Sequence, residues 1–64
     1  MKIKIQWTDG THIKTTLSSF LKHNRDDQEM IEKVQKKSEA AKIGKKFFKD
    51  GGGAIPEFSL IRLD

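Results

Sequence analysis

The chain has 64 residues, no cysteine, and a formal net charge of +4 from 13 Lys and Arg against 9 Asp and Glu. This length predicts a single domain covering residues 1–64, and the lack of cysteine excludes disulfides and thiolate metal sites. The sequence has no apolar segment long enough to span a bilayer and no secretory signal at its start, so we expect a cytoplasmic protein.

Residues 1–17 are predicted to form a β-hairpin whose turn lies in the sequence WTDGT. A two-residue turn would place Trp7 opposite His12 and leave each apolar residue beside a polar one. A three-residue loop instead pairs Ile5 with Ile13 and gathers the large apolar side chains on one face. The pattern therefore favours the three-residue loop, with its glycine in the left-handed conformation.

The opposite face of this hairpin carries Lys2, Lys4, Lys14 and His12. Such a face suits contacts with phosphate groups. It is also typical of a solvated strand surface whose lysines protect a sheet edge from aggregation, which is the more common role. The sequence leaves both interpretations open.

The region 19–43 is predicted to be helical, with a break near Asn24 because the sequence KHNRDDQE contains no apolar residue. The main helix is expected to begin at Asp26, which forms a pair resembling a capping box with Glu29. We expect it to end at Gly44, a residue type that commonly follows the last helical turn.

Lysines are concentrated towards the end of this helix and just beyond it. Acidic residues at its start and lysines at its end oppose the helix dipole, which gives the lysines up to Lys42 a structural explanation. The dipole does not explain Lys45, Lys46 and Lys49. These three lysines are therefore candidates for binding an anionic partner.

Residues 45–63 are predicted to form a second hairpin, with strands over 45–49 and 57–63 and a long, flexible glycine-rich connection. The glycines are followed by a strand rather than by a helix, so we favour a plain loop over a phosphate-binding one. One of Phe47 and Phe48 is expected in the core. The other is either packed under the loop or exposed, where it could stack on a base.

Strict alternation along the last strand places Ile61 and Leu63 on the helix-covered face, and Phe58 and Leu60 on the other face. A domain with one helix covers only one face of its sheet. We therefore expect Phe58 and Leu60 to form a homodimer interface, with the loop that carries Ile55 as the alternative cover.

These elements predict an α+β fold of order β-β-α-β-β, in which two hairpins form one antiparallel sheet and one helix packs on one face. The core is expected to contain one of the two adjacent phenylalanines together with Ile3, Ile5, Trp7, Ile13, Leu17, Phe20, Leu21, Met30, Ile31, Val34, Ala41, Ile61 and Leu63.

No nucleophile stands near a plausible base, and neither histidine has metal-ligand spacing. His12 with Lys14 is the nearest approach to an acid–base pair acting on RNA, and the spacing gives it no support. We therefore expect a non-enzymatic binding module without a cofactor. The alternative to nucleic-acid binding is a protein–protein adaptor or inhibitor that acts through a sheet edge or an exposed apolar patch. Our leading hypothesis is nucleic-acid binding through Lys2, Lys4, Lys14, Lys45, Lys46 and Lys49.

Overall fold

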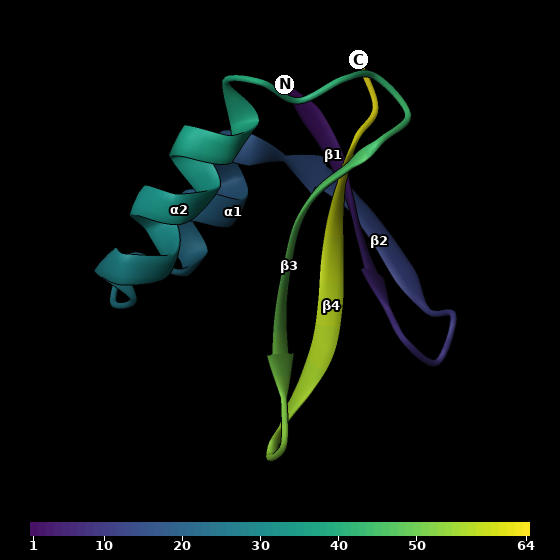
Figure 1. The fold of residues 1–64 in the computed structure, drawn as a ribbon, viewed down its shortest axis with the longest axis vertical. Helices are drawn as coiled ribbons and strands as arrows, with labels where there is room; N and C mark the ends of the chain where they lie inside the picture. Colours follow the sequence, from purple (N-terminus) through teal and green to yellow (C-terminus); the bar gives the residue numbers. More distant parts are fainter.

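The computed structural model describes the backbone of all 64 residues and every side chain except that of Ile55. The strands form one antiparallel sheet of order β2-β1-β4-β3, with both helices against one face (Figure 1). The α+β class is confirmed, but two helices stand where one was expected. The elements in chain order are β1 (Lys2–Trp7), β2 (His12–Thr16), α1 (Leu17–His23), α2 (Gln28–Ser38), β3 (Lys46–Gly52) and β4 (Ile55–Arg62).

The predicted register of the first hairpin is confirmed. Ile5 lies opposite Ile13. The loop is closed by the N–H of Trp7, which donates to the carbonyl of Thr11 at 2.9 Å, and by the N–H of Gly10, which donates to the carbonyl of Trp7 at 3.1 Å. Gly10 has a φ of 92°, the left-handed conformation that a three-residue loop of this kind requires.

The break expected near Asn24 is present and separates α1 from α2. The backbone N–H of Asn24 donates to the carbonyl of Phe20 at 3.2 Å, and its side-chain amide donates to the same carbonyl at 2.8 Å. The carboxylate of Asp27 accepts from the N–H of Met30 at 3.2 Å. The N-cap of α2 is therefore Asp27 rather than Asp26.

Helix α2 is shorter than predicted. It ends at Ser38, whose hydroxyl donates to the carbonyl of Gln35 at 2.7 Å and so competes with the helical hydrogen-bond pattern. Gly44 does not end the helix. It lies in the connection to β3, has a φ of 80°, and donates its N–H to the carbonyl of Arg62 at 2.7 Å. The guanidinium of Arg62 donates to the carbonyl of Ala41 at 2.7 Å, which ties this connection to β4.

The second hairpin has longer strands and a shorter turn than predicted. Strand β3 continues to Gly52 and β4 begins at Ile55, so only residues 53–54 connect them. Gly51 has a φ of 96°, and a Cβ there would lie 2.5 Å from the carbonyl oxygen of Pro56. The glycines therefore allow two strands to approach closely rather than forming a long flexible loop.

The predicted orientation of β4 was wrong. Leu60 lies opposite Ile5 and Phe48 and is fully buried under the helices. Phe58 shares this face, and its ring centroid lies 6.2 Å from that of Phe48. These two residues belong to the chain's own core, so they no longer support a homodimer interface. The alternative cover by Ile55 concerns a side chain outside the described residues.

Three residues predicted to be in the core lie outside it: Ile13, Ile61 and Leu63. Ile13 is 52% exposed, because the two short helices do not cover the edge strand β2 at this point (Figure 1). Ile61 and Leu63 are only half-buried. Within the described chain, no helix is long and apolar enough to cross a bilayer. The buried hydrophobic residues are Ile3, Ile5, Phe20, Met30, Ile31, Val34, Ala41, Phe48 and Leu60.

Candidate nucleic-acid interface

The face of the sheet opposite the helices carries three aligned lysines. Residues that lie directly opposite each other in an antiparallel sheet share a face. Lys14 lies opposite Lys4, Lys4 opposite Ile61, and Ile61 opposite Lys46. These four residues form one row across all four strands, which we call the lysine row. Since neighbouring strands are about 4.8 Å apart, the row is roughly 14 Å long.

A second row runs beside the lysine row and contains His12, Gln6, Ser59 and Lys49. Lys2 lies two residues before Lys4 on β1 and therefore points to the same side. The lysine row, the second row and Lys2 together make up what we call the open face. Five of the six lysines predicted to bind nucleic acid thus lie on one side of the sheet.

An irregularity in β3 brings Lys46 and Lys49 to the same face. Lys46 lies opposite Ile61 and Phe48 lies opposite the next residue of β4, so Phe47 is an extra residue in the strand. In a regular strand, two residues three positions apart point to opposite sides. The bulge at Phe47 therefore aligns the two lysines while Phe48 stays in the core.

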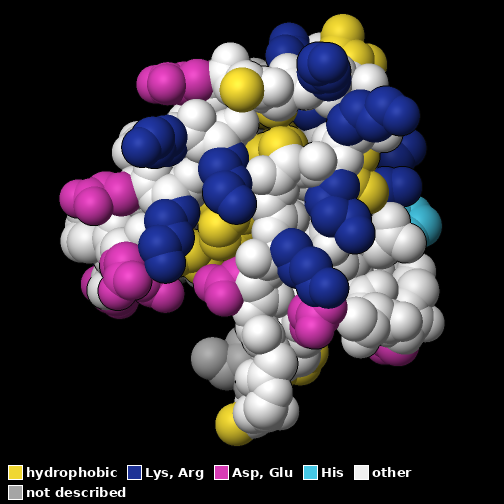
Figure 2. All heavy atoms as spheres, in the orientation of Figure 1, with side chains coloured by type: hydrophobic (Ala, Val, Ile, Leu, Met, Phe, Trp, Pro, Cys, Tyr) yellow, Lys and Arg dark blue, Asp and Glu magenta, His cyan; other side chains and the backbone are white. Residues whose placement is uncertain are grey.

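The open face has little acidic charge. Neither row contains an Asp or Glu, and Glu57 lies beside the second row. The Nζ of Lys49 lies 2.7 Å from a carboxylate oxygen of Glu57, in a pair that is partly exposed and therefore weak. At the end of the chain, the carboxylate of Asp64 accepts from the backbone N–H of Lys2 at 2.7 Å. Figure 2 shows basic side chains on both sides of the front strand, with acidic ones along the helix side and beside the lower part of the strand.

Two shallow hollows meet at Lys46. A groove of about 340 Å³ on the open face is lined by Lys46, Lys49, Ile61 and their neighbours. Around the edge of β3, a second hollow of about 310 Å³ is lined in part by Lys45, the sixth lysine predicted to bind nucleic acid. We call this second hollow the Phe47 pocket. It is lined by Lys37, Ala40, Ala41, Lys42, Lys45, Lys46 and Phe47.

Sequence reasoning did not identify Lys37 and Lys42 as site residues, because the helix was expected to reach residue 43 and its dipole would then explain both lysines. Since α2 ends at Ser38, the dipole does not account for Lys42. The run Lys42 to Phe47 holds three lysines and an aromatic ring within six residues. This concentration of lysines beside an aromatic residue was the feature of the sequence that could have indicated the site.

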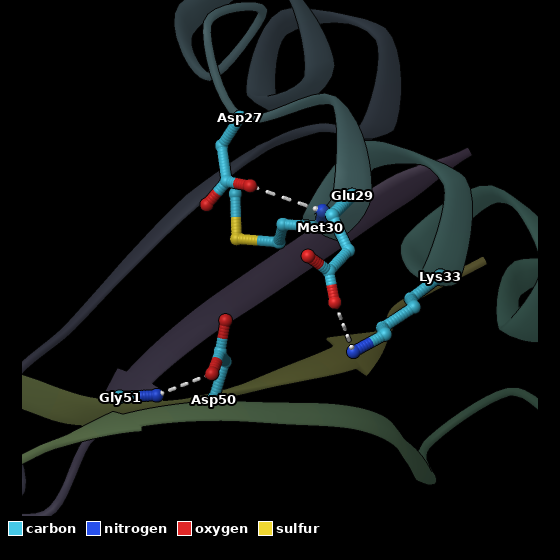
Figure 3. A network of polar contacts seen from close by, with 6 residues as sticks. All are labelled: Asp27, Glu29, Met30, Lys33, Asp50 and Gly51. Carbon is cyan, nitrogen blue, oxygen red and sulfur yellow. Dashed lines mark hydrogen bonds and ion pairs between the residues drawn. The ribbon is translucent and has the colours of Figure 1, made fainter.

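A third hollow, of about 610 Å³, lies between α2 and β3 on the helix side and has mixed charge. Figure 3 shows that three of its polar side chains, those of Asp27, Glu29 and Asp50, have partners within the chain. Asp27 caps α2, the carboxylate of Glu29 lies 3.2 Å from the Nζ of Lys33, and Asp50 accepts from the N–H of Gly51 at 2.8 Å. These contacts stabilise local structure and do not favour an anionic ligand.

The described residues contain no group of three or more His, Asp or Glu side chains arranged to hold a metal ion. Comparisons of the chain with protein-family models, with curated proteins and with solved structures find no match.

Proposed function

We propose that this protein is a non-enzymatic, cytoplasmic module that binds nucleic acid through the open face of its sheet. The observation that carries this proposal is the lysine row, in which Lys4, Lys14 and Lys46 are held in line by three different strands. Like charges fixed side by side repel each other. A polyanion laid across the row relieves that repulsion and releases its own counterions.

The chemistry of the open face favours contacts with phosphates over contacts with bases. Its two rows contain no Phe, Tyr or Trp side chain, and lysine acts as a point charge that reads little sequence. If four or five lysines each neutralise one phosphate, the logarithm of the binding constant should fall with the logarithm of salt concentration with a slope of about −3 to −4.5.

Fluorescence anisotropy with labelled DNA and RNA oligonucleotides over a range of salt concentrations tests this proposal. The variant Lys4→Gln/Lys14→Gln/Lys46→Gln should lose about 2 to 3 units of the slope. The matched control Lys22→Gln/Lys33→Gln/Lys36→Gln removes the same charge from exposed helix positions and should keep the full salt slope. Absence of binding at low salt and tens of micromolar protein, or equal losses in both variants, would contradict the proposal.

A protein–protein adaptor or inhibitor is the second candidate, and one observation favours it. Ile13 is 52% exposed on the edge strand β2, where an added strand from another protein could cover it. This candidate leads if nucleic acid does not bind. The variant Ile13→Lys should then abolish capture of a protein partner, and Ile43→Lys should preserve it, because Ile43 is 65% exposed but lies in the connection before β3.

A further inference from the structure

The Phe47 pocket combines an aromatic ring with concentrated positive charge. Phe47 is half-buried, since it packs against the core and also lines the pocket. The remaining lining consists of lysines and two alanines, without an acidic side chain. Lysines alone would suit any anion, whereas an aromatic ring beside them suits a ligand that has both a flat apolar part and phosphates.

The size and position of the pocket narrow this choice to part of a nucleic-acid strand. Its volume of about 310 Å³ is at the lower end of the range for small-molecule sites, about 300–1,000 Å³, and fits one nucleotide rather than a duplex. Lys46 lines the pocket and is also the last residue of the lysine row. A backbone that follows the row therefore reaches the pocket without leaving positively charged surface.

We infer that the preferred ligand is single-stranded nucleic acid, with one base stacked on Phe47 and its backbone continuing past Lys46 along the lysine row. This inference rests on the proposed function and specifies its substrate. A duplex can lay its phosphates on the row, but its bases are already stacked and paired, so none is free to enter the pocket.

The variant Phe47→Leu tests the role of the ring, because leucine keeps apolar volume against the core but offers no aromatic surface. Affinity for a 12-nucleotide oligothymidylate should fall about 5- to 150-fold, as expected for loss of one base–aromatic stack. Affinity for a 12-base-pair duplex should not change. The salt dependence of oligothymidylate binding should keep its slope, since no phosphate contact is lost. Phe47→Trp should retain single-strand binding.

A second variant covers the case in which Phe47→Leu fails to fold. Lys42 and Lys45 are exposed, so Lys42→Gln/Lys45→Gln should fold normally. It should reduce the salt slope for oligothymidylate by about 1 to 2 units and leave the slope for duplex unchanged.

The outcomes separate this inference from the proposed function. If neither oligothymidylate nor duplex binds, both the proposed function and the inference about single strands are wrong. A second outcome is that the lysine-row variant weakens binding, whereas the Phe47 and Lys42/Lys45 variants change the affinities for oligothymidylate and for duplex equally. In that case the open face binds nucleic acid, and the inference about single strands is wrong. Displacement of oligothymidylate by micromolar thymidine monophosphate would indicate a pocket for free nucleotides and would also overturn it.

Discussion

Replacing Leu60 by alanine should destabilise the protein far more than replacing the adjacent Ile61. Leu60 is fully buried between Ile5 and Phe48, which lie opposite it on the two neighbouring strands. Ile61 is half-buried on the open face between two lysines. The two residues are neighbours in the sequence and similar in size, so the comparison isolates which face each one occupies.

The expected magnitudes follow from these environments. A buried Leu→Ala change costs about 2–5 kcal/mol, because it removes apolar contacts and leaves a cavity. Domains are stable by about 0.05–0.15 kcal/mol per residue, which gives about 3–10 kcal/mol for the 64 residues of this chain. The change at Leu60 therefore removes a large share of the total. Ile61→Ala should cost about 1 kcal/mol, since its side chain already contacts water.

Urea unfolding followed by the fluorescence of Trp7, the single tryptophan, measures both changes. Leu60→Ala should lower the unfolding midpoint by about 1 M or more, or prevent folding, while Ile61→Ala remains folded. Leu60→Lys should likewise give an unfolded chain rather than a folded monomer. Equal losses, or a larger loss for Ile61→Ala, would show that β4 presents its other side to the helices.

Three further predictions concern the turns and the charges. Gly51→Ala should lower the melting temperature by more than an ordinary surface substitution does, because its φ of 96° is strained for alanine and its Cβ would meet the facing backbone. Hydrogen bonds from the hydroxyl and N–H of Thr11, at 2.6 and 2.9 Å, lower the pKa of Asp9 from its usual 3.8, so this carboxylate stabilises the hairpin above that pH and loses its effect as the pH falls through the lowered pKa. Asp9→Asn should therefore flatten the acid side of the melting-temperature profile, and an unchanged profile would argue against this contribution. Glu57→Gln frees Lys49 and should tighten nucleic-acid binding several-fold at low salt, a gain that a second change, Lys49→Gln, should remove; anisotropy measures both.

The first hairpin was predictable because local signals agreed. Only a three-residue loop aligned Ile5 with Ile13, and the glycine stood where a left-handed residue was needed. In the last strand the signals disagreed. Glu57 and Ser59 are polar and point to the same side of the strand as Ile61, which correctly indicated that this side is the open face. The apolar residues Ile61 and Leu63, however, suggested that the same side faces the core.

The candidate site depends on features that are not local in the sequence. Strand β4 is the last in the chain but lies between β1 and β3, and this order alone places Lys46 in line with Lys4. The bulge at Phe47 interrupts the alternation from which the orientation of Lys49 would be predicted. Composition therefore identified the lysines, whereas their alignment required the three-dimensional structure.

Amide NMR chemical-shift mapping during titration with oligothymidylate at low salt tests most directly whether nucleic acid binds along the lysine row and at Phe47. If it does, the largest shifts should cluster at the lysine row and at Phe47, and they should fade as salt is added. Shifts centred on the exposed face of α2, around Lys33 and Lys36, with the lysine row unperturbed, would contradict this mode of binding.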